Sequence, residues 1–303
     1  MMRVTFLGTS AAQPTLSRNL SGLSVRRERE HILFDCGEGS QRQMMRYGTG
    51  FAVDRIFFTH FHGDHYLGLL GFLRTLNMQG RSEPLNLYGP SPAISLLDRA
   101  VHLGFDPQAF EIAVHELSPG DQVALAGATV TAVPVEHRIP AFGYLLREAE
   151  RPGEFHPEKA AALGVPAGPL FGELQHGRPV VVGGRQIDPA EVLGPSRPGR
   201  SLVVSGDTRP CASLQEAARG ADVLVHEATF VEDDRPRALE TQHSTAREAA
   251  ALASRAGVKR LLLTHFSSRY DDGMAALLNE AREEFPGAEI AYDGLTFEVP
   301  LPK

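Results

Sequence analysis

Short apolar runs that each lead into a polar residue recur along the whole chain. They are HILFDCG from His31, RIFFTH from Arg55, TVTAVPVEH from Thr129, SLVVSGD from Ser201, DVLVHEAT from Asp222 and RLLLTH from Arg260. Runs of this length and composition predict buried strands. In a sandwich of sheets, residues just past strand ends collect along one rim. We therefore expect six side chains that are distant in sequence to converge there: His60, His137, Asp207, His226, Glu227 and His265.

Helical stretches lie between these runs, at residues 212–219 and from Ser244, where a Ser-x-x-x-Glu start and Gly257 mark the helix ends. Strands that alternate with helices indicate an α/β protein. With 303 residues and 42% hydrophobic content, the chain can bury one large core or two modest ones. No apolar run approaches the ~20 residues that a bilayer span needs, and the start has no sustained apolar segment. We therefore expect a soluble, cytoplasmic protein without a membrane partner.

Residues 151–200 differ in composition from the rest of the chain. Glycine and proline supply 17 of these 50 residues, so we expect no long helix or strand inside this segment. Its six Lys and Arg residues slightly outnumber its five acids, whereas the rest of the chain is acidic. The segment is interpreted as an insertion or arm, and a solvated loop is the simpler alternative.

The two cysteines, Cys36 and Cys211, are too few for a cysteine-based zinc site or a disulfide framework. Any metal must therefore sit on histidines and carboxylates. The net charge of -7 does not indicate a protein coated in cations for nucleic acid. Binding depends on local patches, however, and two divalent metals would add about four positive charges to the formal count.

The stretch HFHGDH places three histidines and one aspartate within six positions. His60 and His62 are two residues apart, whereas Asp64 and His65 are adjacent and so diverge. A loop of this kind can supply two metals, with His60 and His62 on one and Asp64 and His65 on the other. A solvated histidine-rich turn is the alternative. Because one loop cannot complete two coordination shells, further ligands must come from elsewhere.

Three residues that follow apolar runs are the best candidates for the missing ligands. Asp207 has two carboxylate oxygens and could bridge metals ~3.5 to 4 Å apart, the separation that two-metal hydrolases use. His137 would then complete the first shell and His265 the second. Taken singly, each residue also has an ordinary explanation as a polar residue at a strand end or, for Asp207, as a turn or cap.

Several motifs together resemble a known family. They are FLGTSAAQPTLSRN, LFDCGEGSQRQ, THFHGDHYLGL, VEHRIPAFGY, GVPAGPLFGEL, SGDTRP, HEAT, HST and THFSSRY. The metal motif resembles the metallo-β-lactamase superfamily, and the combination is similar to the short-form ribonuclease Z family of tRNA 3′-processing endoribonucleases. The resemblance implies a single α/β domain over residues 1–303, an αββα four-layer sandwich from which residues 151–200 protrude as a flexible Gly/Pro-rich arm.

The resemblance also implies the reaction. It is removal of the 3′ trailer from precursor tRNA by metal-hydroxide attack on a phosphodiester, leaving a 3′-hydroxyl, with two Zn²⁺ per subunit. Asp64 would orient the attacking water or accept its proton, and Glu227 would hold His243 as the proton donor to the leaving oxygen. Without the family pattern, Glu227 is an ordinary acid at a helix start and His243 an ordinary turn residue before the helix. Asp35 is a candidate partner for a metal-bound imidazole, or a turn residue, and His226 a supporting residue.

For the arm, the resemblance implies an exosite that grips the tRNA body, with GVPAGPLFGEL as its signature. RNA contacts are expected at Lys159, Gly168, Pro169, Arg178 and Arg269, and also at Arg185. The family works as a homodimer in which one subunit's arm can serve the other's active site. One motif departs from the family: PTLSRN keeps Pro14, Arg18 and Asn19 but has Leu16 where lysine is usual, which puts sensitivity to the CCA end in doubt.

Other functions remain open at this point. A dinuclear phosphodiesterase for small diesters or cyclic nucleotides would use the same metals but would not need the arm. A metal-binding scaffold without catalysis is disfavoured because no ligand or proton donor is missing, and a thioester hydrolase would have no use for Glu227 and His243. The ligand types accept zinc, manganese or iron. The sequence leaves open the metal, the cleavage position relative to CCA and the tRNA preference.

Overall fold

The computed structural model describes residues 1–103, 109–271 and 273–302, and two large sheets form its centre. Within the described residues, the first sheet has the strand order β18-β1-β3-β4-β5-β6-β7 and the second β17-β15-β14-β13-β10-β9-β8. The first sheet consists of β1 (Met2–Gly8), β3 (Gly22–Arg27), β4 (Glu30–Phe34), β5 (Arg55–Phe57), β6 (Leu85–Pro90), β7 (Ile112–Leu117) and β18 (Thr296–Glu298). The second consists of β8 (Gln122–Leu125), β9 (Ala128–Pro134), β10 (Phe142–Glu148), β13 (Ser201–Val204), β14 (Val223–Glu227), β15 (Leu261–Thr264) and β17 (Glu289–Ile290).

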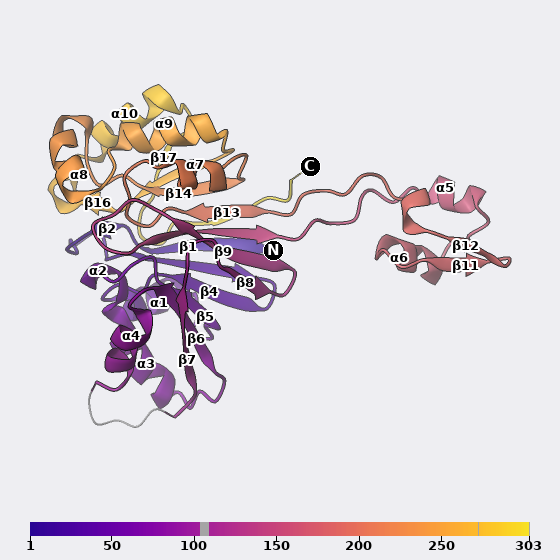
Figure 1. Ribbon diagram of the computed structural model, residues 1–303, viewed down its shortest axis with the longest axis horizontal. Helices are drawn as coiled ribbons and strands as arrows, with labels where there is room; N and C mark the ends of the chain where they lie inside the picture. Colours follow the sequence, from indigo (N-terminus) through magenta and orange to yellow (C-terminus); the bar gives the residue numbers. More distant parts are fainter. Residues whose placement is uncertain (104–108, 272, 303) are drawn as a thin grey trace.

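Helices cover the outer face of each sheet (Figure 1). The first sheet carries α1 (Ser40–Tyr47), α2 (Gly63–Tyr66), α3 (Gly68–Met78) and α4 (Ala93–Val101), and the second carries α7 (Ala212–Ala217), α8 (Arg235–Thr241), α9 (Ala246–Ala256) and α10 (Met274–Glu284). A short parallel pair, β2 (Ser10–Ala11) and β16 (Phe266–Ser267), links loops of the two halves. The order helix, sheet, sheet, helix is the predicted four-layer sandwich, and that prediction is confirmed.

Alternation along single strands explains how one chain fills three apolar layers. In β4, Ile32 and Phe34 pack in the cluster between the sheets, whereas Leu33 packs in the cluster beneath α1, α3 and α4. In β15, Leu262 faces the inter-sheet layer, while its neighbours pack beneath the helices of the second half. Strands buried on both faces need continuous apolar runs, which the sequence shows. Each fully buried leucine or phenylalanine contributes about 1.5–3 kcal/mol.

The six apolar runs form β4, β5, β9, β13, β14 and β15, but the predicted helix ends need correction. The helix predicted over 212–219 ends at Ala217. The helix predicted from Ser244 begins at Ala246, with Thr245 as its N-cap: the Thr245 side chain accepts from the N–H of Glu248 at 3.2 Å. The Ser244 hydroxyl instead donates to the carbonyl of Thr208 at 2.6 Å.

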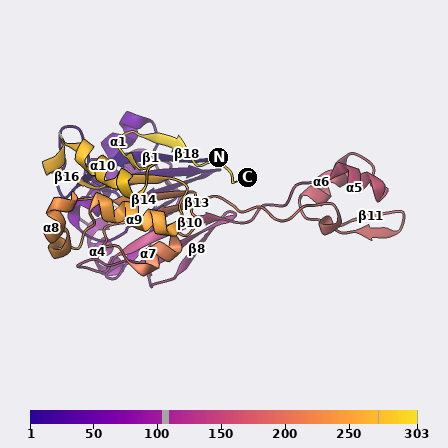
Figure 2. The ribbon, with the colours of Figure 1, turned by 90° about the horizontal axis from the view of Figure 1, so that it is seen from above.

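Residues 151–200, the arm, project far from the sandwich (Figures 1 and 2). The arm leaves the end of β10 and returns to the start of β13, which are antiparallel neighbours. Its tip, residues 157–192, contains α5 (Pro157–Ala162), α6 (Pro169–Gln175), β11 (Val180–Val182), β12 (Arg185–Ile187) and a 3-10 turn (Pro189–Glu191). A small core of its own holds the tip together: Ala160, Val165, Leu174, Val180, Ile187 and Val192. The short helices and the hairpin fit a segment that is rich in glycine and proline.

Candidate metal centre

Five of the six side chains predicted to converge meet at one rim of the sandwich, whereas His226 belongs to none of the ligand groups. β4 and β5 run parallel in the first sheet, and β13, β14 and β15 run parallel in the second. Parallel strands end at the same edge, so the residues that follow them are brought together. Asp35 follows β4, and His60 lies in the loop between β5 and α2. Asp207 follows β13, and His265 follows β15. His137 lies three residues beyond β9, on a segment fixed by a bridge between Glu136 and Arg209.

Three histidines and Asp207 form the first group of possible metal ligands. His62 Nδ1 lies 3.0 Å from His60 Nε2 and 3.2 Å from His137 Nε2. His60 Nε2 lies 3.5 Å from Asp207 Oδ2. All four side chains therefore present one donor atom to a common point.

Asp64, His65 and His265 form the second group. The Nε2 atoms of His65 and His265 are 3.2 Å apart, and they lie 3.5 and 3.4 Å from Asp64 Oδ2. Asp207 faces this group as well: its Oδ2 is 3.4 Å from His65 Nε2 and its Oδ1 is 3.4 Å from His265 Nε2. Asp207 thus lies between the two groups, at the position a bridging carboxylate needs.

The outer ring nitrogens show which way the imidazole lone pairs point. His137 Nδ1 donates to the carbonyl of Gln242 at 3.0 Å, and His65 Nδ1 donates to Asp35 Oδ2 at 2.7 Å. The Thr59 hydroxyl donates its hydrogen to Asp35. Its oxygen therefore accepts a hydrogen bond from His60 Nδ1 at 3.1 Å. Each ring thereby directs its Nδ1 hydrogen away from the site and turns its Nε2 to the interior, as metal-binding histidines do.

Thr229 orients the His265 imidazole in the way that Thr59 orients His60. Its hydroxyl donates to Glu227 Oε2 at 2.7 Å and accepts from His265 Nδ1 at 3.1 Å. Nitrogen lone pairs and carboxylate oxygens that face one another repel unless a cation lies among them. Ligands at ~2.0–2.2 Å from a tetrahedral zinc lie about 3.3–3.6 Å apart, close to the separations above. The residues present therefore fit two metal ions.

The pKa shifts agree with a centre built for cations. Burial, the largest cause, lowers the pKa of His60, His62 and His137, so these rings are neutral. Burial would also lower the pKa of His65, but the surrounding carboxylates, Asp207 first, raise it well above its ordinary value. For Asp64, burial opposes ionisation, yet the neighbouring imidazoles hold its pKa below the usual range. The neighbouring imidazoles thus keep the Asp64 carboxylate ionised, as a site for cations requires.

Strained backbone positions surround the centre. Among described residues other than glycine, φ is positive at Ala12, Asp35, Gln242 and His265 in the site, and at Glu28 in a distant turn. Such conformations cost of order 1–3 kcal/mol each and are typical of functional sites. At Ala12, the strained backbone directs its N–H to Asp64 Oδ2 at 2.8 Å. At Gln242, it presents the carbonyl that orients His137.

Glu227 and His243 form the predicted pair beside the metal ligands. His243 Nδ1 donates to Glu227 Oε1 at 2.8 Å and lies 3.8 Å from Asp207 Oδ2. Glu227 is buried and also accepts from the N–H of Thr208 at 2.9 Å. Burial would lower the pKa of His243, but Glu227 and Asp207 raise it to about 9. The imidazole is therefore protonated at neutral pH and can donate a proton.

An open cleft of about 1100 Å³ leads to this centre. The metal-ligand candidates His62, Asp64, Asp207 and His265 line it together with His243. Arg269, predicted to contact RNA, lines it as well. Arg138 and Arg237 also line the cleft. Nothing in the sequence distinguishes them from the other arginines.

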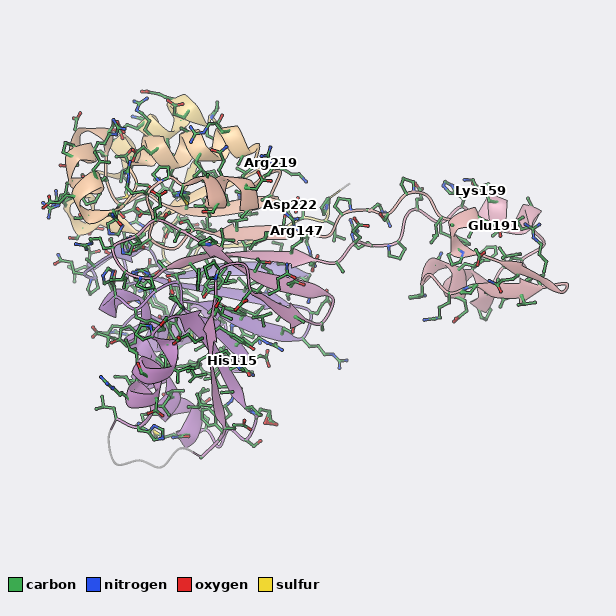
Figure 3. The ribbon with its side chains drawn as sticks, viewed as in Figure 1. His115, Arg147, Lys159, Glu191, Arg219 and Asp222 are labelled. Atoms are coloured by element: carbon green, nitrogen blue, oxygen red, sulfur yellow. The ribbon has the colours of Figure 1, made fainter. Side chains whose placement is uncertain are left out.

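The other predicted RNA contacts lie on the arm, away from the centre. Lys159 is exposed on α5 (Figure 3) and forms no ion pair with any described residue. Arg178 pairs with Glu173 and Arg185 with Glu191, all at the surface. Gly168 has φ 143° and is the N-cap of α6, with Pro169 at its first position. That backbone conformation favours glycine, which explains the Gly-Pro sequence structurally.

The PTLSRN loop borders the cleft. Pro14 lines the cleft and Leu16 is fully exposed at the tip. Arg18 is held inside: it donates to Thr9 Oγ1 at 2.7 Å and stacks over the ring of Phe266. The Asn19 side chain donates to the carbonyl of Glu38 at 2.9 Å. The retained residues thus fix the loop, while the departure from the family falls at its exposed tip.

Several residues that orient the ligands could not be identified from the sequence. They are Thr59, Thr229, Gln242 and Ala12. Asp35 was predicted as an imidazole partner and holds His65. His226 is buried, its Nδ1 donates to the carbonyl of Glu227, and its Nε2 has no partner among the described residues. Hydroxyls after apolar runs are too common to indicate a role, and backbone groups leave no sequence signal.

Comparison with known proteins gives consistent matches. The profile of the family described as Beta-lactamase superfamily domain matches residues 30–165 and 170–266. The chain is 60% identical to ribonuclease Z of Myxococcus xanthus over 303 residues and 48% identical to that of Methanosarcina acetivorans over 301, covering 99% of each chain. The crystal structure of the short form of human tRNase Z is 29% identical, with a TM-score of 0.73, over 99% of this chain and 100% of that one. No helix in the described part of the chain is long and apolar enough to cross a membrane.

Proposed function

This chain belongs to the ribonuclease Z family of the β-lactamase superfamily, and we propose that it is a metal-dependent endoribonuclease that removes the 3′ trailer of precursor tRNA. The observation that carries the proposal is the pair of ligand groups joined by Asp207 beside the Glu227–His243 pair, all opening on one cleft. Phosphodiester cleavage requires an activated nucleophile, charge neutralisation at phosphorus and a proton for the leaving oxygen.

In this proposal His60, His62 and His137 would hold one zinc ion, Asp64, His65 and His265 would hold the other, and Asp207 would serve both. Bound metals supply the nucleophile and the charge neutralisation. Asp64, held by the Ala12 N–H, would orient the attacking water or accept its proton. His243 donates its proton to the departing 3′-oxygen, and the ionised Glu227 holds the imidazolium in place. The tRNA therefore keeps a 3′-hydroxyl.

The cleft and the arm supply the RNA contacts. Arg138, Arg237 and Arg269 lie where phosphates next to the cut would pass. In this proposal residues 1–303 form one catalytic domain of a cytoplasmic protein, and residues 151–200 are its tRNA-binding arm. Lys159, Gly168, Pro169 and Arg178 lie on the arm tip, where folded RNA would be recognised by shape and backbone.

The topology favours action of the arm on a second subunit. β10 begins beside the centre, where the Phe142 N–H donates to the carbonyl of Thr59, and ends at Glu148. Seven residues at ~3.3 Å each put the arm's root roughly 20 Å from the centre, and the arm then points away from the sandwich (Figure 1). We therefore propose a homodimer in which each arm presents RNA to the partner's centre.

The decisive experiment is incubation of the purified protein with a precursor tRNA that carries a 3′ trailer, with and without a chelator. Mapped ends should show one cut at the 3′ side of the tRNA, abolished by the chelator and restored by added Zn²⁺ or Mn²⁺. Elemental analysis should find about two transition-metal ions per chain. A protein that binds no metal or leaves the trailer intact would contradict the proposal.

A further inference from the structure

A buried ion cluster lies at the root of the arm. Glu148, the last residue of β10, accepts from Arg27 Nε at 2.8 Å and from Arg200 Nε and Nη2 at 2.7 Å each. The backbone N–H of Arg200 donates to the same carboxylate at 3.2 Å. All three residues are buried. Together they are called the arm-root cluster.

The arm-root cluster joins the arm to both sheets. Glu148 is the last residue of β10, and Arg200 is the last residue of the arm, just before β13 of the second sheet. Arg27 ends β3 of the first sheet and also donates to the carbonyls of Ala126 and Gly127 in the turn between β8 and β9. Although burial opposes its ionisation, hydrogen bonds from Arg200 lower the pKa of Glu148 to about 2.

Beyond the cluster, the two strands of the stalk, residues 149–156 and 193–200, lie against each other. Arg151 and Arg197 exchange backbone hydrogen bonds of 2.8 and 2.9 Å, and the Gly194 N–H donates to the carbonyl of Glu154 at 2.8 Å. A Cβ added at Gly153 would collide with the carbonyl oxygen of Gly194. The two stalk strands thus form a hydrogen-bonded pair, so a rotation at the root of the stalk would move the tip with it.

Burying an ion cluster is weak evidence for stability, because desolvation offsets the attraction, but the fixed geometry of bidentate arginines specifies orientation. None of the three residues lies near the reaction centre, since β10 separates them from it. We propose that Glu148 is a positioning residue: it holds the arm in one orientation relative to the catalytic body and so determines where arm-bound RNA presents its 3′ end. The second half of this inference rests on the proposed function.

Arm orientation can be measured without RNA. Spin labels at Val181→Cys on the arm tip and Met78→Cys on the body occupy exposed sites, whereas the native Cys36 and Cys211 are buried. In labelled protein diluted with unlabelled chains, the interlabel distance distribution should be narrow. Glu148→Gln should broaden or shift it, because the amide cannot satisfy both guanidinium groups. Glu216→Gln removes a carboxylate from an exposed pair with Arg219 (Figure 3) and should leave the distribution unchanged.

The kinetic test separates positioning from general stability. Glu148→Gln should raise the KM for precursor tRNA at least about tenfold, since two contacts on one RNA reinforce each other only when their spacing is right. Its kcat/KM for bis(p-nitrophenyl) phosphate, which does not reach the arm, should stay within about twofold of wild type. Arg200→Lys, which keeps the charge but not the bidentate geometry, should give an intermediate KM.

Two results would overturn the inference: an unchanged distance distribution with an unchanged KM for precursor tRNA, or a parallel loss of activity on both substrates. If Glu148→Gln fails to fold, Gly153→Ala is tested in the same way, because it parts the stalk strands outside the sandwich core. Wild-type protein that fails to cleave precursor tRNA would refute the proposed function, whereas the distance measurement would still decide whether Glu148 fixes the arm.

Discussion

At the scale of single residues, the Glu227–His243 pair makes a direct prediction about catalysis. His243→Gln removes the proton donor but no proposed metal ligand of either group. Cleavage of precursor tRNA should fall about 10²- to 10⁴-fold in kcat, while metal content by elemental analysis stays at the wild-type level. Glu227→Gln leaves the imidazole without its carboxylate and should lower kcat less. A variant that loses its metal along with its activity would assign His243 to the coordination shell instead.

His31 links pH to stability through burial. Burial, with help from Arg26, lowers the pKa of this histidine to about 4, against about 6.5 when it is unfolded. Between these pH values the His31 imidazole is protonated in the unfolded chain but neutral in the folded protein. The free energy of unfolding therefore falls as the pH falls through this window. The expected loss is about 3 kcal/mol. His31→Gln should remove this part of the slope when metal-free protein is unfolded in urea from pH 7 to 4. Parallel curves for variant and wild type would contradict the assignment.

At the scale of elements, α9 shows what a cap contributes. Thr245 caps the helix N-terminus, and Gly257, with φ 67°, ends it. Thr245→Ala should lower the free energy of unfolding by about 1 kcal/mol, because the Glu248 N–H loses its acceptor. Thr245→Ser keeps the hydroxyl and is the matched control, which should unfold within a few tenths of a kcal/mol of wild type. Urea denaturation of both variants measures the difference, and equal losses would show that packing rather than the cap stabilises this end.

Elements and ligands were predictable where the physical cause is local. Short apolar runs rich in β-branched residues indicate buried strands. Histidines and aspartates that follow several such runs predict a metal site together, although none of them does so singly. The N-cap of α9, Thr245, was missed by one residue because Ser244 is an equally good cap in isolation. Only the hydrogen bond from the Ser244 hydroxyl to the carbonyl of Thr208 excludes Ser244 as the cap. The core of the arm tip comes from six residues at irregular spacing, which no helix or strand period reveals.

At the scale of the whole molecule, the arm separates tRNA processing from phosphodiester chemistry. The stalk strands are hydrogen-bonded at Glu154 and Gly194, and the tip has its own core. Replacing residues 155–193 by a short glycine linker should therefore leave the sandwich intact. Cleavage of bis(p-nitrophenyl) phosphate should persist within a few-fold of wild type, and cleavage of precursor tRNA should fall at least about 10²-fold. An equal loss of activity on both substrates would count against a tRNA-binding exosite.

The direction of the arm makes the last prediction, and it depends on a feature that the sequence could not show. The arm follows the C-terminal end of β10. Because β10 pairs antiparallel with β13, whose C-terminal end leads to Asp207, the root of the arm and the centre lie at opposite ends of β10. If each arm serves the partner's centre, an armless chain and an Asp64→Ala chain, each inactive on precursor tRNA alone, should complement each other. Random mixing gives half mixed dimers with one working site each, so roughly a quarter of wild-type activity should return. An arm that serves its own centre would leave the mixture inactive, and sedimentation of the mixture would show whether mixed dimers had formed.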